Sequence, residues 1–288
     1  MWPKRAANTL LTMFRFLDYS FFCNALIGVI LISICSAVIG TYIITRRMAA
    51  ISGGVTHACF GGLGLGYFLG VSPVLMAGVF AVGSSVGVEL LARRMSLRED
   101  SAIAVVWALG MALGVLFVFL TPGYVPELNA FLFGNILTVS VPDLRAIAIF
   151  AVILGVFFIW QYRNIVAVAF DRDFATVAGL PVRFVSYSMT VLVAVCIVLT
   201  IRLAGIMMLM SMLSLPIITA EVFWRRYQPV MTGAVAFSLV ASVGGLFVST
   251  VVDVPCSALI VLIMVALFVG AKIIAFLNSK YTRIRKKI

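Results

Sequence analysis

The sequence is poor in charged residues and in the side chains that enzymes most often use for catalysis. Only 11% of its 288 residues are charged, and it has a single histidine, His57. No pattern pairs a nucleophile with a basic partner, and no Walker A sequence is present to bind ATP phosphates. We therefore expect no enzymatic activity, and ATP hydrolysis would require a separate subunit.

Cysteine is also scarce. The five cysteines are odd in number, lie far apart and form no Cys-x-x-Cys pair. This pattern favours neither a disulfide framework nor a zinc knuckle. We expect them to act as small apolar residues in helices, and we expect no permanently bound cofactor. The cysteines are Cys23, Cys35, Cys59, Cys196 and Cys256.

Apolar residues, in contrast, are in excess and make up 64% of the chain. An ordinary soluble domain has about 45–50%. A soluble fold of this length has too little interior to bury so much apolar surface, whereas a lipid bilayer solvates it. No long polar block could form a second domain. The sequence therefore predicts a single transmembrane domain over residues 1–288.

A helix that crosses the bilayer needs about 20 apolar residues, because the hydrocarbon core is about 30 Å thick. The sequence predicts an all-α, polytopic membrane protein with about eight or nine transmembrane helices. A tight turn before Pro73 joins the second and third, and the sixth and seventh meet at Gly205. The candidate spans lie at 21–44, 54–70, 73–91, 101–120, 143–160, 184–203, 205–222, 229–250 and 256–276.

The net charge of +11 does not indicate a nucleic-acid partner, because the basic residues form short clusters between apolar stretches. Such clusters are typical of cytoplasmic loops. We expect the basic tail, 279–288, in the cytoplasm together with four arginine-bearing loops. An odd number of spans then places the basic N-terminus outside, so either residues 1–20 form an interfacial helix or one span is miscounted. The four loops are those at Arg46–Arg47, Arg93–Arg98, Arg163–Arg183 and Arg225–Arg226.

Two connections are too long to be simple turns. The first, 121–143, is largely apolar and either dips into the membrane or docks on the outer face. The second, 161–183, is predicted to be cytoplasmic and to contain a short helix. Asp171 and Asp173 suit the N-terminal end of that helix, where the helix dipole favours a negative charge. Gly179 and Pro181 end the helix. This segment is either a docking site for a cytoplasmic partner or a plain connection.

His57 lies at the start of the second span. Ionisable groups in a membrane tend to face a cavity or a partner, and imidazole is a common metal ligand. A structural hydrogen bond to a neighbouring helix is the alternative. Further along this span, Gly62, Gly66 and Gly70 recur every four residues and share one helix face. Such a face favours the close packing of two membrane helices.

Two glutamates lie near the predicted cytoplasmic ends of spans. Glu89 and Glu221 each have an arginine four residues later, at Arg93 and Arg225. Because residues four apart are neighbours on a helix surface, we expect each pair to form a salt bridge within one helix.

Taken together, these stretches resemble the membrane permease subunits of bacterial metal-ion ABC importers, the zinc, manganese and iron class known as the ABC-3 family. The resemblance covers about residues 20–276. Its motifs are Arg46-Arg47-Met48 followed by Thr56-His57-Ala58 and the glycine-rich helix; Phe131-Leu132-Phe133-Gly134; and Asp171 through Ala175 to Pro181, followed by Gly205, Leu215-Pro216 and Thr219-Ala220.

The resemblance implies a type II-like importer fold in the bacterial plasma membrane, formed by a homodimer. It also implies a pair of cytoplasmic ATP-binding subunits and an extracytoplasmic metal-binding protein that delivers a divalent ion to His57. Family members often carry an aspartate where this chain has Gly53, which leaves open whether His57 contacts the metal and which metal is carried. The residues implied to contact the ATPase are Asp171, Arg172, Asp173, Ala175, Gly179 and Pro181.

A transporter driven by an ion gradient is the alternative function. Such transporters often show inverted repeats and carboxylates near the middle of the membrane. The sequence shows no such repeat and no clear midplane carboxylate.

Overall fold

The computed structural model describes residues 18–95, 98–122, 134, 136–252 and 254–285, and every regular element among them is a helix. The all-helical prediction is therefore confirmed. The helices are α2 (Ser20–Thr45), α3 (Ala50–Leu69), α4 (Pro73–Arg94), α5 (Glu99–Leu120), the 3-10 turn η2 (Ile136–Thr138), α7 (Val141–Phe170), α8 (Arg172–Val177), α9 (Val182–Met212), α10 (Leu215–Phe223), α11 (Tyr227–Val252) and α12 (Cys256–Arg285).

Among the described residues, seven helical stretches are long and apolar enough to cross a membrane, rather than the eight or nine expected. The difference has two causes. First, α3 is not among these stretches, although it has 20 residues; six of them are glycine, and they also include Ser52, Thr56 and His57. In addition, 182–223 forms one continuous helical path, where the sequence predicted two spans.

The path over 182–223 nevertheless changes direction at Gly205, where the sequence predicted a break. Gly205 has φ 81° and ψ 170°, which lies outside the helical region and suits a residue without Cβ. Gly134 packs on this kink, since a Cβ added to Gly134 would lie 2.3 Å from the carbonyl carbon of Ala204. The connection before α7 therefore reaches back to the kink. Phe131–Phe133 lie outside the described residues.

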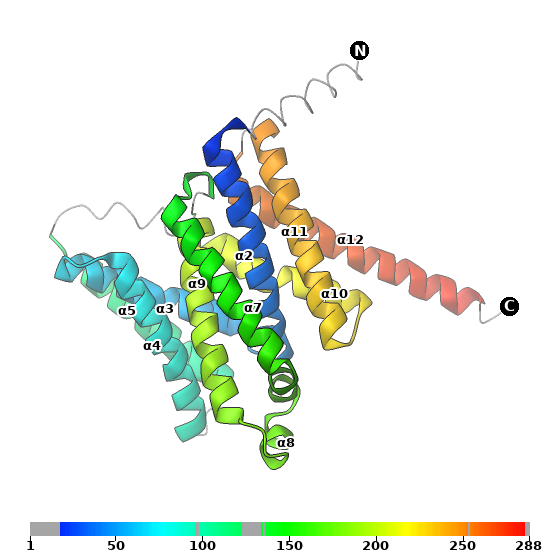
Figure 1. Ribbon diagram of the computed structural model, residues 1–288, viewed down its shortest axis with the longest axis horizontal. Coiled ribbons are helices and arrows are strands. Elements are labelled where there is room, and N and C mark those ends of the chain that lie inside the picture. Colours follow the sequence, from blue (N-terminus) through cyan, green and yellow to red (C-terminus); the bar gives the residue numbers. More distant parts are fainter. Residues whose placement is uncertain (1–17, 96–97, 123–133, 135, 253, 286–288) are drawn as a thin grey trace.

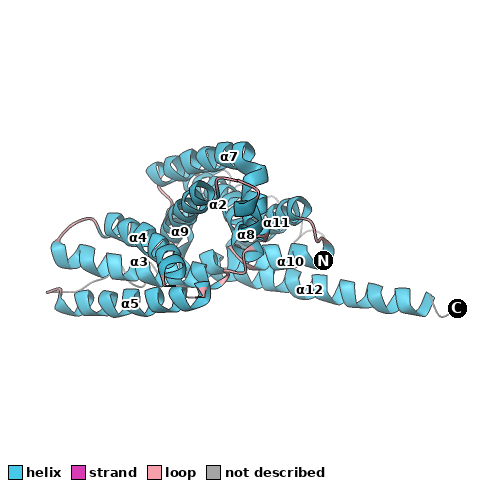
Figure 2. Cartoon of the chain, turned by 90° about the horizontal axis from the view of Figure 1, so that it is seen from below, coloured by secondary structure: helices cyan, strands magenta, loops and turns pink. Residues whose placement is uncertain are grey.

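The helices form a central group with two extensions (Figures 1 and 2). In the centre, α2 contacts α7, α9 and α11. On one side, α3, α4 and α5 pack on one another and form a three-helix unit, which joins the centre through α9. On the opposite side, α12 extends away after contacting α9, α10 and α11. Its last turns include 279–285 of the predicted basic tail.

The predicted cytoplasmic loops converge at one end of the molecule, which we call the arginine face. Ion pairs join Arg46 and Arg172 to the end of α4 and the start of α5. Arg47 and Arg225 line one cavity, together with Phe170 at the end of α7. The four arginine-bearing loops therefore share a face, as the sequence predicted. Residues 1–17, including the predicted interfacial helix, lie outside the described residues.

Close backbone contact holds α3 against its neighbours. A Cβ added to Gly110 of α5 would lie 2.3 Å from the Cα of Ala58 on α3. On the α4 side, a Cβ on Gly62 would lie 2.4 Å from the carbonyl oxygen of Met76, and Gly66 is similarly close to Pro73. Gly70 was expected to share this packing role and does not. It ends α3 with φ 67°, and nothing lies within 4 Å of its Cβ position.

This packing predicts the effect of adding one methyl group. Gly110→Ala should destabilise the protein by about 1–3 kcal/mol, because backbone atoms of α3 must move to admit the methyl group. The matched control is Gly155→Ala on α7, where the added methyl group meets nothing within 4 Å. Thermal unfolding in detergent should show a lower Tm for Gly110→Ala and an unchanged or higher Tm for the control. Equal Tm values would contradict the close contact.

Candidate functional site

His57 lies on α3, and its ring stacks on the indole of Trp107 from α5 (ring centroids 4.6 Å apart, planes 10° from parallel). One helical turn earlier, Gly53 leaves room for two side chains. A Cβ at this position would lie 3.1 Å from Cε of Met210 and 3.2 Å from Cζ3 of Trp107. His57 is half-buried beside these groups.

The surroundings of His57 offer few metal ligands. No group of three or more His, Cys, Asp or Glu side chains comes together anywhere in the described part of the chain. Gly53 supplies no carboxylate, and Trp107 and Met210 crowd the space where one would begin. Since metal sites in proteins usually draw on three or more protein ligands, His57 of one chain does not form a complete site.

The second predicted site is the segment around α8 on the arginine face. The carboxylate of Asp171 accepts a hydrogen bond from the backbone N–H of Phe174 (2.9 Å), which caps the helix. Gly179 adopts φ 74° and Pro181 precedes α9, so the start and stop signals in the sequence are correct. Asp173 lies in the first turn of α8, where a negative charge is favoured.

The connection before α8 is shorter than expected. Residues 161–170 were predicted to belong to a loop, but they form the last part of α7. Ile165, Val168 and Ala169 are all buried, and their spacing places them on one helix face against the core. The helix therefore continues until Asp171, whose backbone is extended.

One side of α8 is anchored, and another is exposed. Ala175 is fully buried, whereas Phe174 and Val177 are 67% and 89% exposed. An open cavity lies between α8 and the start of α9, lined among others by Arg172 and Pro181. A capped helix with exposed apolar side chains, outside the long apolar helices, is typical of a surface that another protein covers.

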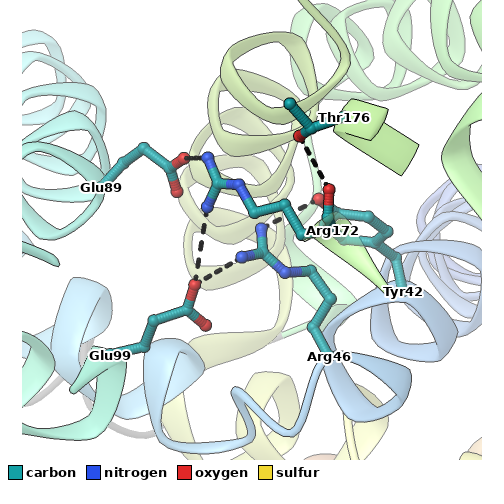
Figure 3. A network of polar contacts seen from close by, with 6 residues as sticks. All are labelled: Tyr42, Arg46, Glu89, Glu99, Arg172 and Thr176. Atoms are coloured by element: carbon teal, nitrogen blue, oxygen red, sulfur yellow. Dashed lines mark hydrogen bonds and ion pairs between the residues drawn. The ribbon is translucent and has the colours of Figure 1, made fainter. Parts of the chain in front are cut away.

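Arg172 connects α8 to the three-helix unit (Figure 3). Its guanidinium group donates to Glu89 near the end of α4 (2.7 Å) and lies 3.9 Å from Glu99 in the first turn of α5. The Glu89 side chain is almost fully buried. The backbone carbonyl of Arg172 accepts a hydrogen bond from Thr176 (2.8 Å), which orders the helix that carries this arginine.

A second arginine completes this network. Arg46, just after α2, forms an ion pair with Glu99 and donates to the hydroxyl of Tyr42 (3.1 Å). The Arg46 side chain is 7% exposed, so its charge requires this compensation. Two arginines and two glutamates from four separate segments thus neutralise one another. We call these four residues the charge network.

The sequence did not predict this network. Glu89 was expected to pair with Arg93, whose side chain the structure does not describe, but Glu89 contacts an arginine 83 residues away. Glu221 was expected to pair with Arg225, and that prediction is wrong. The helix ends at Phe223 and Trp224 is extended, so Arg225 is not on the same helix face. Glu221 and Arg225 only line the same cavity.

Comparisons with known proteins agree with this architecture. The model of the ABC 3 transport family matches residues 18–275. The manganese transport system membrane protein MntC of Halalkalibacterium halodurans is 30% identical, over 88% of this chain and 87% of that protein. A probable iron transport system membrane protein of Haemophilus influenzae is 28% identical, over 88% of this chain and 94% of that protein.

A solved structure described as PsaBC from Streptococcus pneumoniae in complex with Fab superimposes with a TM-score of 0.77. Its matching chain is 26% identical, and the match covers 89% of this chain and 94% of that one. The family match spans nearly all of the described helices, and the structural match reproduces their arrangement. The chain therefore belongs to the ABC 3 transport family and is a multi-pass membrane permease.

Proposed function

We propose that the chain is the permease of an ATP-driven importer for a divalent metal ion: zinc, manganese or iron. Two copies form the translocation pathway, a pair of cytoplasmic ATP-binding subunits drives it, and an extracytoplasmic metal-binding protein delivers the ion. The names of the relatives support a metal as cargo, because they include manganese and iron transport proteins. The sequence lacks a Walker A motif, which supports ATP hydrolysis by a separate subunit.

The observation that carries this proposal is the exposed apolar surface of α8 on the arginine face. Phe174 and Val177 project from a helix that Asp171 caps and that the buried Ala175 anchors. An apolar surface held at the end of a membrane protein suits a cytoplasmic protein partner. The ATP-binding subunit is the partner that a permease of this family requires, and α8 is the surface through which it would act.

The proposed cargo contact is His57. The imidazole of His57 can bind zinc, manganese or iron, although no group of three or more His, Cys, Asp or Glu side chains comes together in the described part of the chain. A second copy of the chain would add a second imidazole to the pathway. The metal would be held weakly by few ligands, which suits a transported ion that must leave again.

The docking role of α8 predicts a loss of assembly. Replacing Phe174 and Val177 together by alanine should reduce the amount of co-purifying ATP-binding subunit by about tenfold, because buried apolar anchors dominate interface energy. The control is Phe119→Ala. Phe119 is also an exposed apolar residue, but it lies at the C-terminal end of α5, away from the arginine face. Affinity purification of the tagged chain, followed by quantitative immunoblotting, measures the ratio. Undiminished co-purification of the double variant would exclude α8 as the docking surface.

The cargo role of His57 predicts a loss of transport without a loss of assembly. His57→Ala should lower uptake of radiolabelled metal by about tenfold or more, because the proposed contact loses its imidazole and no group of three or more His, Cys, Asp or Glu side chains among the described residues can replace it. Zinc, manganese and iron are offered separately and in competition to cells that depend on this system. Phe68→Ala, an exposed residue on the same helix, is the control. Normal uptake by His57→Ala would remove this residue from the pathway and leave the α8 proposal intact.

A further inference from the structure

A cavity of about 460 Å³ opens on the arginine face, where four helices end or begin. It lies between the ends of α2, α7 and α10 and the start of α11. Two of these helices are membrane spans whose terminal residues line the cavity, Thr45 as the last residue of α2 and Tyr227 as the first of α11. Since lipid headgroups lie at the ends of membrane spans, the cavity is at the depth of the headgroups.

The charged side chains of this cavity favour an anion. Arg47 and Arg225 both line it, and both are exposed. None of the ion pairs between described residues uses either guanidinium group. Glu221 is the acidic residue of the lining, so two positive charges and one negative charge leave the cavity with a net charge of +1. Basic pockets between membrane helices are typical binding sites for anionic lipid headgroups.

The backbone at Arg47 suggests that its side chain is used. The end of α2 forms a turn in which the N–H of Met48 donates to the carbonyl of Ile43 (3.0 Å). Glycine is preferred at the left-handed position of such a turn, but here Arg47 occupies it with φ 59°. Arg47 is the only non-glycine residue with positive φ in the described part of the chain. Because a side chain at this position is strained, its retention points to a function.

The cavity also has apolar walls, which suit a lipid rather than a free phosphate ion. The indole of Trp224 packs on α11, since a Cβ added to Gly233 would lie 2.5 Å from its Cζ3. Trp224 is nevertheless 41% exposed, and tryptophan is enriched where membrane spans meet the headgroups. Ile44 and Val230 add further apolar surface to the lining. The glycerol backbone of a phospholipid could lie against these side chains while its phosphate meets the arginines.

A buried hydroxyl group gives an independent indication of a ligand. The side chain of Tyr227 lines the cavity and is 6% exposed. Its hydroxyl has no hydrogen-bond partner among the described residues. Buried hydroxyl groups are usually paired, so an oxygen atom of a bound headgroup would be a favourable partner.

We propose that this cavity binds the headgroup of an anionic phospholipid. Arg47 and Arg225 bind the phosphate, because guanidinium groups form strong, charge-assisted hydrogen bonds with phosphate oxygens. Glu221 accepts hydrogen bonds from headgroup hydroxyls such as those of phosphatidylglycerol. None of the lining residues belongs to α8, so the inference depends neither on the metal cargo nor on the proposed docking surface.

Lipid binding can be measured on the full chain by native mass spectrometry. The chain is purified in detergent, and phosphatidylglycerol or phosphatidylethanolamine is added. The wild type should retain about fivefold more phosphatidylglycerol, because the lining has a net positive charge. Arg225→Gln should reduce the retained phosphatidylglycerol about fivefold. The matched control is Arg226→Gln, the exposed neighbour outside the lining, which should leave it unchanged. Equal retention of both lipids, or equal losses in the two variants, would overturn the proposal.

Arg47→Gly separates the use of the side chain from its role in the fold. Glycine adopts φ 59° without strain, so this variant should keep or raise the Tm measured without added lipid. It should still retain about fivefold less phosphatidylglycerol than the wild type, because the phosphate loses one guanidinium group. A lower Tm with undiminished lipid retention would show that Arg47 is structural, and it would contradict the proposed site.

Two further measurements distinguish a lipid from other anionic ligands. An excess of inorganic phosphate should not displace phosphatidylglycerol from the wild type, because phosphate makes no use of the apolar walls. Displacement would identify a site for free phosphate and overturn the assignment to a lipid. Arg225→Gln should also leave co-purification of the ATP-binding subunit unchanged. Loss of that subunit with phosphatidylglycerol still retained would make the cavity a protein contact and equally overturn the proposal.

Discussion

The close approach of α3 and α5 is the constraint on which the rest of the structure depends. Lipid tails are as apolar as leucine, so burying apolar side chains between membrane helices gives little driving force. What remains is dispersion at short range, which requires small residues along the line of contact. Gly110 lies against Ala58 for this reason, and Gly64 lies against Gly114. Glycine therefore holds α3 in place through close backbone contact.

The charge network lies at the end of the three-helix unit that faces the arginine face. Glu89 and Arg46 are almost fully buried, and a buried charge without its partner costs about 3–5 kcal/mol. Arg202 and Asp143 also pair, but Arg202 is half exposed, and such pairs contribute about 0–1 kcal/mol. The distinction matters for α8. A six-residue helix has little stability of its own, so its position depends on Arg172, on Ala175 and on the cap at Asp171.

The features that the sequence predicted are local ones. Long apolar stretches, the break at Gly205, the cap at Asp171 and the basic loops each depend on residues close in the chain. The features that it did not predict depend on distant residues. Glu89 has an arginine four positions ahead, and no local signal points to Arg172 instead. The stacking of Trp107 on His57 likewise joins two helices that periodicity cannot place together. Gly70 continues the glycine repeat of the sequence, but it lies just after α3, which ends at Leu69. Its left-handed backbone ends the helix instead of packing against a neighbour.

The proposed homodimer would bear directly on the role of His57. In the described part of one chain, no group of three or more His, Cys, Asp or Glu side chains comes together, so a complete metal site at His57 would need ligands from the proposed partner copy. In a dimer with two-fold symmetry, each copy would present the same imidazole, the same Trp107 and the same tie to its own α8. One His57 alone would offer a single ligand. Metal binding would therefore depend on both copies, and the two ATP-binding subunits proposed to dock on the two α8 helices would share that symmetry.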